Sequence, residues 1–435
     1  MHPGLSDELV PSPDGIDLNK LTKDTVITTD ACNTAGKLRR VLVQMIKDVT
    51  NEDGEIFEFD CMNHLQNVWF GGMEKAVTQQ LNAILRTSLD EIDPKLRVSA
   101  SMSVIIRAVD NEFSLSANYP KGHGQLFLEW IREYYPGVFL MHVERTSGSR
   151  QDLCTEGAMA IFWNYPYYVE FLDTMLRKPP KQKGQEVSIL QQSLFVTLSS
   201  EEMIALSRLF SIMHLSVCIP FRWLSGKTHE LAKYKWGPMN MSQAIDTLYE
   251  KMIELEKKPH LILDKSFMMG IFEEYRSKDD RLPPFTEYWK YMFEEKKIGS
   301  VARKSGTKEV PLACLRRELF HPTRKTVLKS STRLKELAKV AAVAIIAELR
   351  NKKKATHIYL SATTPPSPYA WLHCTDKMKD AMLGKAATND IAEVRQSRLR
   401  TSKQYTSLVQ RLSAIHAAII ILIPSTDSMI DWRML

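Results

Sequence analysis

The residues best suited to chemistry lie where short apolar runs end. The run Thr25 to Thr29 is rich in β-branched residues and is followed directly by Asp30. A second run, Ile56 to Asp60, is followed by the step Cys61-x-x-His64. Open α/β sheets bind ligands beyond the carboxyl ends of their strands, so Asp30 is a candidate metal ligand. An acid in this position could equally cap a helix.

The Cys61-x-x-His64 step supplies two soft ligands. A structural zinc site normally has four, in two closely spaced pairs. The sequence has no second Cys-x-x-Cys or His-x-x-x-His pair. Ordinary packing is therefore the simpler interpretation of this step.

Other residues have types that suit a polyanion. Arg150 follows a Ser-Gly-Ser turn just before a predicted helix, where a guanidinium and backbone N–H groups can bind phosphate or simply form a cap. Arg222 and Trp223 could form an exposed cation–π stack or pack in the core. Arg395 and Arg398 belong to a late basic run that suits DNA or a nuclear-import receptor, or a solvated helix face.

A late acid completes the set of candidates. Glu393 follows Thr388, Asn389 and Asp390, each of which could cap the long helical pattern from Val394 to Ile421. Glu393 would then lie in the first turn of that helix, where the helix dipole alone already favours an acid.

The composition is that of an ordinary intracellular protein. The chain has 435 residues, a net charge of +7, 44% hydrophobic residues and 25% charged residues. Its six cysteines have no disulfide-framework spacing, and its start is polar, so a reducing nuclear or cytoplasmic location is expected. The longest apolar run, Ala414 to Pro424, is about half the length of a membrane span, so no membrane association is expected.

Periodicity indicates how these residues must be positioned. Between the two apolar runs, residues 35–49 have helical spacing, which predicts strand, helix, strand. The sequence from about residue 71 to 355 is mostly helical in pattern, and Ser199-Ser200-Glu201-Glu202 and Ser242 resemble helix starts. Short strands are expected at 138–143 and 187–196. The predicted helices are 73–85, 98–109, 124–135, 157–176, 200–214, 242–256 and 334–350.

Taken in order, these motifs resemble the hAT-type transposases. The order is Asp30 after a strand, Cys61-x-x-His64 after the next strand, Arg222-Trp223 in a helical stretch, and Glu393 opening a late helix. That family has an RNase H-like catalytic core interrupted by a large all-helical insertion. The resemblance implies metal-dependent DNA strand cleavage and transfer, with Asp30 and Glu393 as ligands of Mg²⁺ or Mn²⁺ and His64 near the reacting phosphate.

The resemblance predicts an α/β fold that is mostly helical overall. Residues 1–24 would be a disordered lead-in, 25–70 the first part of an incomplete RNase H-like core, 71–375 the helical insertion, and 376–435 a returning core helix and tail. The family's first metal-binding Asp has no counterpart before Asp30, so we expect an N-terminally truncated, inactive enzyme. Two carboxylates bind Mg²⁺ weakly, which argues against cleavage. The basic runs lead us to expect weak and non-specific DNA binding. Homo-oligomerisation is left open. The alternative is a non-enzymatic helical protein that binds nucleic acid or other proteins.

Overall fold

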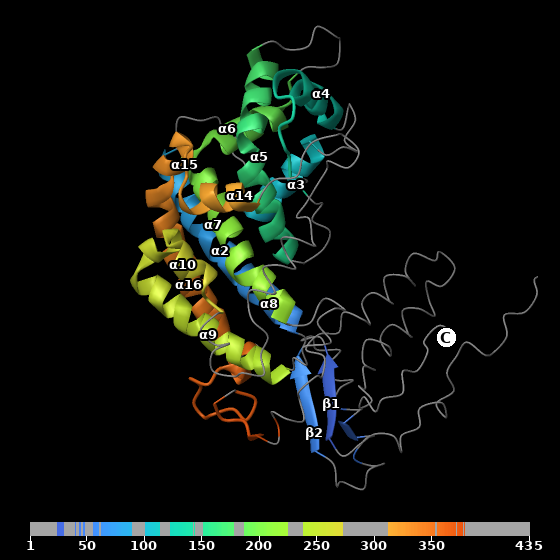
Figure 1. Cartoon of the computed structure of the whole chain (residues 1–435), viewed down its shortest axis with the longest axis vertical. Coiled ribbons are helices and arrows are strands. Elements are labelled where there is room, and N and C mark those ends of the chain that lie inside the picture. Colours follow the sequence, from blue (N-terminus) through green and yellow to red (C-terminus); the bar gives the residue numbers. More distant parts are fainter. Residues whose placement is uncertain are drawn as a thin grey trace, which may run out of the picture. The chain divides into compact units, whose positions relative to one another are not determined.

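The structure is a computed structural model that describes part of the chain. The described ranges are 24–29, 55–60, 62–88, 101–113, 122–141, 151–177, 187–224, 238–272, 312–352, 355–370 and 372–376, with isolated positions outside them. All statements below concern these residues. Figure 1 shows them in colour.

The chain divides into two compact units, each described here by itself. The first consists of Met1–Leu65, Ser225–Met241 and Cys374–Leu435, and the second of Gln66–Leu224 and Ser242–His373. The second is called the helical unit below. The domain boundaries expected from the resemblance remain a prediction.

The first unit contains a pair of parallel strands, β1 (Asp24–Thr29) and β2 (Glu55–Asp60). Their register pairs Asp24 with Glu55 and Thr29 with Asp60. Both strands therefore end at the same edge, with Asp30 and Cys61 next in the sequence. Parallel pairing requires a crossover between the strands, for which residues 35–49 have the helical pattern.

The predicted α/β class is wrong for the described chain. Helix accounts for 80% of the interpretable residues, and the strands within the described ranges are β1 and β2 alone. Two strands do not make the multi-stranded sheet of an RNase H-like core, and an isolated pair has too little apolar surface to form a core of its own. Beyond Asp60 the apolar residues repeat at helical spacing, so the described chain buries them between helices.

The helical unit is built from long helices joined by short ones. Helix α7 (Glu201–Met213) is at its centre, and α5 (Gln151–Arg177) and α16 (Ser331–Arg350) pack against it. The others are α2 (Met62–Ser88), α3 (Met102–Phe113), α4 (Gly124–Tyr134), α6 (Ile189–Ser199), α8 (Ile219–Leu224), α9 (Pro238–Lys257), α10 (Lys265–Met269), α14 (Leu312–Phe320) and α15 (Lys325–Lys329). A π-helical turn, η5 (His214–Cys218), and two 3₁₀ turns, η7 (Pro259–Leu263) and η9 (Ala355–Tyr359), complete it.

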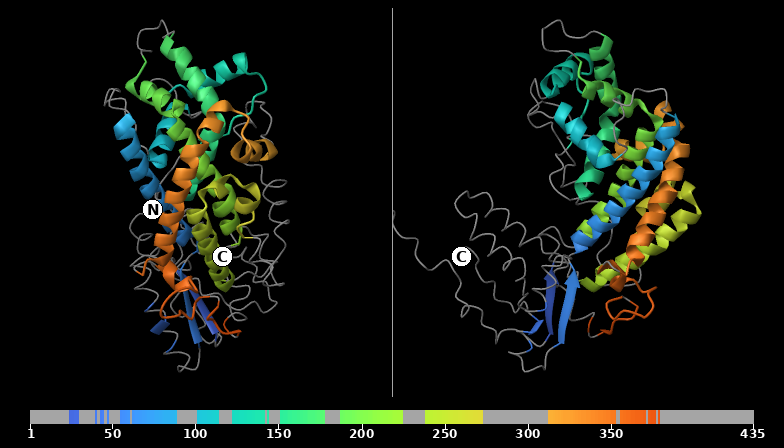
Figure 2. Two further views of the ribbon diagram at one scale, coloured as in Figure 1. Left: turned by 90° about the vertical axis from the view of Figure 1, so that its left-hand side faces the viewer. Right: turned by 180° about the vertical axis from the view of Figure 1, so that it is seen from behind.

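Helix α7 is the core of this unit, because its residues from Met203 to Met213 are all buried. Helix α5 packs on one part of its surface and α16 on another. Figure 2 shows α16 running along the outside of the bundle. A helix that is apolar all round needs neighbours on every side. Helix α7 obtains them from α5, α6, α14, α15 and α16.

The complete burial of α7 also explains why the chain has an apolar segment of membrane-spanning length. Glu201–Phe221 is long and apolar enough to cross a bilayer, and the window that passes this test is 100% buried inside the protein. Core helices pass the same test, so this single segment is weak evidence for a membrane span. The described chain gives no clear sign of a membrane protein.

Two predicted strands are absent, for local reasons. Residues 187–196 form the start of α6, whose N-cap Ser188 makes a capping box with Gln191. Residues 138–141 are irregular because side chains of α5, not a strand, satisfy their backbone. Asn164 accepts from the Met141 N–H at 3.0 Å and donates to the Met141 carbonyl at 2.6 Å.

The two predicted helix starts have different outcomes. Ser200 is the N-cap of α7 and accepts from the Met203 N–H, as expected. Ser242 is not a cap, because α9 begins at Pro238. Its buried hydroxyl instead donates to the Tyr359 carbonyl at 2.9 Å and ties α9 to η9.

Candidate functional site

The predicted site residues fall into two groups. Only His64, Arg222 and Trp223 lie in described elements: His64 is in the first turn of α2, and the other two are in α8. The backbone of these three is described and their side chains are not. The remaining candidates lie outside the described residues: Asp30, Cys61, Arg150, Glu393, Arg395 and Arg398.

The two motifs with described backbones belong to neighbouring helix ends. Trp69 of α2 and Phe221 of α8 are both fully buried, and their rings meet edge to face with centroids 4.9 Å apart. His64 precedes Trp69 by about 7.5 Å along the helix axis, at about 1.5 Å per residue. Arg222 and Trp223 follow Phe221 directly. The structure therefore packs Trp69 of α2 against Phe221 of α8 within the helical unit.

Both helix ends lie where the chain passes between the units. The helical unit begins at Gln66, two residues after His64, and its first segment ends at Leu224, one residue after Trp223. Both motifs thus lie at the points where the chain enters and leaves the helical unit.

Next to this junction is a buried polar cluster that the sequence analysis missed. Thr155 of α5 contacts two residues of η5 through its hydroxyl: His214 Nδ1 at 2.9 Å and Cys218 Sγ at 3.3 Å. Gln66 of α2 is also buried, and against the larger effect of burial it lowers the pKa of the Cys218 thiol. Thr155, Cys218, His214 and Gln66 are between 0% and 3% exposed.

The cluster contains a cysteine and a histidine, as a catalytic Cys–His pair does, but their pKa values are shifted in directions that do not suit catalysis. Burial lowers the pKa of His214 to about 3, so its imidazole is neutral at physiological pH. Burial also raises the pKa of the Cys218 thiol well above its ordinary value. A reactive cysteine needs a lowered thiol pKa and access to solvent. The cluster therefore holds α5 and η5 together and is not suited to nucleophilic catalysis.

The amino-acid sequence gives only a weak indication of this cluster. Cys218 and His214 are four residues apart inside a long apolar run, where both resemble ordinary core residues. Residues four apart share one side of an ordinary α-helix as well, and a π turn cannot be recognised from apolar spacing. Such turns recur at functional positions in other helices.

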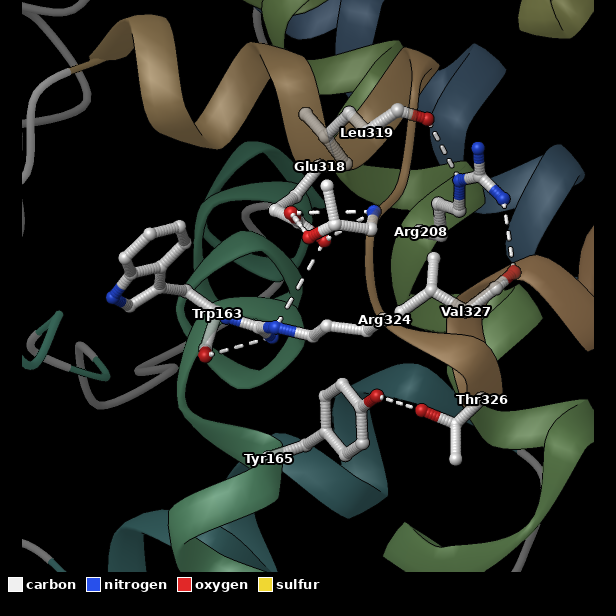
Figure 3. A network of polar contacts seen from close by, with 9 residues as sticks. Trp163, Tyr165, Arg208, Glu318, Leu319, Arg324, Thr326 and Val327 are labelled. Carbon is white, nitrogen blue, oxygen red and sulfur yellow. Dashed lines mark hydrogen bonds and ion pairs between the residues drawn. The ribbon is translucent and has the colours of Figure 1, made fainter.

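A second buried network centres on Arg208 of α7 (Figure 3). Its Nε donates to the Leu319 carbonyl at 2.7 Å, and its Nη1 donates to the Val327 carbonyl at 3.2 Å and the Ser331 hydroxyl at 3.0 Å. Leu319 is near the end of α14 and Val327 is in α15. Arg208 thus places a positive charge against carbonyls at helix ends, which the helix dipole favours. Burial nevertheless lowers its pKa to about 10, although Glu318 acts in the opposite direction.

The outer part of the same network is less buried. Arg324 lies 5.3 Å from the Trp163 ring centroid and 5.8 Å from that of Tyr165. It also pairs with Glu318 at 3.9 Å. Tyr165 and Thr326 join their hydroxyls at 2.5 Å. These contacts fasten the connection between α14 and α15 to α5, and they are structural.

No metal centre is found in the part of the chain that the structure describes. Within it, no three His, Cys, Asp or Glu side chains gather in a way that could hold an ion. The proposed ligands Asp30 and Glu393 lie outside these residues, as does Cys61. A Mg²⁺ or Mn²⁺ site therefore stays a prediction.

Comparison of the chain with protein-family models, with curated proteins and with solved structures finds no match. The case for any function thus depends on the chain's own residues.

Proposed function

We propose that this chain is a transposase-derived protein of the hAT type that has kept DNA binding and lost strand cleavage. The observation that carries the proposal is the junction of α2 and α8. The rings of Trp69 and Phe221 meet edge to face in the helical unit. In the sequence, His64 precedes Trp69 by five residues and the Arg-Trp step follows Phe221 directly, although the two steps are about 160 residues apart.

The strand pair supports the same proposal. Thr29 and Asp60 pair at the ends of β1 and β2, so the chain continues into Asp30 and into Cys61 at one edge. In open α/β sheets, ligands bind beyond the carboxyl ends of the parallel strands, which is this edge. The chain then enters an all-helical unit within six residues of β2, which is the order of elements in the resembled family.

In this proposal, Asp30 and Glu393 are the remnants of a metal site for Mg²⁺ or Mn²⁺. Metal chemistry on phosphodiesters uses carboxylates that hold the ions close to the attacking and leaving oxygens. Two carboxylates give a weak site because Mg²⁺ requires near-ideal octahedral ligation. His64, Arg150, Arg222, Trp223, Arg395 and Arg398 would then contribute only to DNA binding.

The experiment measures DNA cleavage and DNA binding on the same purified chain. We expect no nicking of supercoiled plasmid in Mg²⁺ or Mn²⁺, and binding of duplex DNA that weakens steeply as salt rises. Nicking that Glu393→Gln abolishes would contradict the loss of cleavage. Absence of DNA binding at low salt would contradict the retained function.

A separate measurement tests the ancestry. Fe²⁺ can replace Mg²⁺ at carboxylate sites and generates hydroxyl radicals that cut the nearby backbone. If Asp30 and Glu393 share a site, cuts are expected near both positions, and Asp30→Asn should abolish both. Cuts near one position alone, or cuts unaffected by the substitution, would separate the two carboxylates and overturn the shared site.

The second candidate is a helical protein-interaction module without DNA binding. It is favoured by the predominance of helix and by large apolar side chains that stay exposed, such as Leu372 at 74% and Ile189 at 59%. The DNA-binding assay separates the two candidates, because this module would not respond to salt through phosphate contacts.

A further inference from the structure

One surface of the helical unit is strongly basic. Between residues 314 and 352, which the structure describes without a gap, the exposed acidic side chain is Glu336 alone. The exposed basic side chains in the same stretch are Arg317, Lys325, Lys329, Lys339, Arg350 and Lys352. The exposed face of α15 and α16, with Lys325, Lys329, Lys339 and Arg350, is called the basic ridge below.

The ridge follows from the amphipathic pattern of α16. Its buried residues, among them Leu334, Leu337 and Ala341, face the core and pack against α7. Its exposed residues repeat at intervals of three or four and therefore share one face. They are Thr332, Glu336, Lys339, Val343, Ala347 and Arg350. Figure 2 shows this helix along the outside of the bundle.

The one exposed acid on this face is already paired. Arg333 contacts Glu336 on the next turn and also lies 3.9 Å from Glu202 of α7. Glu336 therefore does little to neutralise the lysines. Arg350 lies over the Tyr249 ring at 5.4 Å, which holds its charge at the surface near α9. The net positive charge of the ridge consequently remains available to a partner.

We propose that the basic ridge binds the phosphate backbone of duplex DNA. The inference rests on the proposed function and specifies which surface carries it. Helix α16 spans about 30 Å at about 1.5 Å per residue. Duplex DNA carries one negative charge per about 1.7 Å of its axis. The exposed face of α16 carries Lys339 and Arg350, and α15 adds Lys325 and Lys329 just before it in the sequence. Several phosphates of a duplex fall within this length, so each of these positive charges can meet one.

A membrane surface fits the ridge less well. Amphipathic helices that bind membranes insert a continuous apolar face between the headgroups. The large apolar side chains exposed on the ridge are Leu328, at 61%, and Val343, at 44%. They are separated by about four turns of helix, so they do not form such a face.

The experiment compares two triple variants of the full chain that remove equal charge. The ridge variant is Lys325→Gln/Lys329→Gln/Lys339→Gln. The control variant is Arg107→Gln/Arg132→Gln/Arg177→Gln, whose arginines are exposed on α3, α4 and α5. Affinity for a fluorescent duplex of about two helical turns is measured by anisotropy across a salt series, after circular dichroism has shown equal helix content.

The expected result is a change in the salt slope of the ridge variant alone. Each phosphate contact contributes about 0.9 to the slope of log Kd against log salt, so three lost contacts should lower it by about 2.7. The affinity advantage of the wild type should then shrink about 40-fold between about 50 and 200 mM salt. The control variant should keep the wild-type slope.

The alternative outcomes separate the two proposals. If the wild type binds DNA and both variants keep its slope, the ridge inference fails and the proposed function stands. If the wild type binds no DNA, the proposed function fails and the ridge inference with it. If the ridge variant binds DNA normally but loses binding to phosphatidylserine vesicles, the ridge recognises anionic lipid and the DNA assignment is overturned.

Discussion

His214 should make the stability of the helical unit depend on pH in a way that can be calculated. Its ring is 3% exposed and contacts the Thr155 hydroxyl at 2.9 Å. Burial lowers its pKa from 6.5 to about 3. The unfolded chain therefore takes up a proton below pH 6.5, while the folded chain keeps this imidazole neutral down to about pH 3.

The sign and size follow from linkage. Because the unfolded state binds more protons between these pKa values, the stability due to neutral His214 is complete above pH 6.5 and is lost as the pH falls toward 3. Each pKa unit corresponds to about 1.36 kcal/mol. Going from pH 7 to pH 5 should therefore reduce the free energy of unfolding by about 2 kcal/mol through this residue alone.

The variant His214→Gln isolates this contribution. Glutamine can still hydrogen-bond to Thr155 but does not titrate, and the titration of all other groups is common to both proteins. Denaturant unfolding followed by circular dichroism should show that the wild type loses about 2 kcal/mol more than the variant between pH 7 and pH 5. Equal losses in the two proteins would show that His214 is accessible to protons in the folded state and would refute the argument.

The remaining predictions concern buried polar contacts. Arg208→Met should lower the free energy of unfolding by about 2 kcal/mol, because the buried Leu319 carbonyl loses its charged donor and the relief of burying a charge offsets only part of that loss. Arg324→Met, at a partly exposed position, should cost less than about 1 kcal/mol, and urea unfolding that ranks the two variants in the opposite order would contradict this account. Asp246, whose pKa is raised chiefly by burial, accepts from the Ser361 N–H at 2.7 Å and from its hydroxyl at 2.5 Å. Asp246→Ala should therefore speed amide hydrogen exchange in residues 360–373 and leave exchange in α16 unchanged, a local effect that mass spectrometry can check.

Helices were predicted well where their apolar face was regular. Residues 334–350 gave α16 nearly to its ends because Leu334, Leu337, Ala341 and Ile345 all face the core. The predicted helix 73–85 was too short, since α2 begins at Met62. Its first turns bury Leu65 and Trp69 on the same face as Met73 and Val77. The prediction missed them because it assigned residues 25–70 to the sheet-containing core.

The failures share a physical cause, which is backbone hydrogen bonding that depends on distant side chains. The segment 138–141 has the composition of a strand, but Asn164 and Trp163 of α5 supply its hydrogen bonds. The prediction of an α/β fold was wrong because it, too, depended on hydrogen bonds to distant parts of the chain. A strand–helix–strand unit predicts its own two strands, but it does not determine whether further strands join them.

Arg208 and His214 also explain how α7, which is buried on every side, acquires a fixed orientation. Apolar burial is roughly proportional to area and has no direction, so it does not determine the rotation of α7 about its axis. Hydrogen bonds do, because they need donor–acceptor distances near 3 Å and near-linear geometry. Arg208 bonds to α14, α15 and α16 on one side, and His214 bonds to α5 through Thr155. The chain then continues through η5 into α8 with helical backbone at His214 and Ile219. The rotation fixed by these two side chains is therefore transmitted through a continuous helical backbone to α8, whose direction depends on buried residues of α7 and η5.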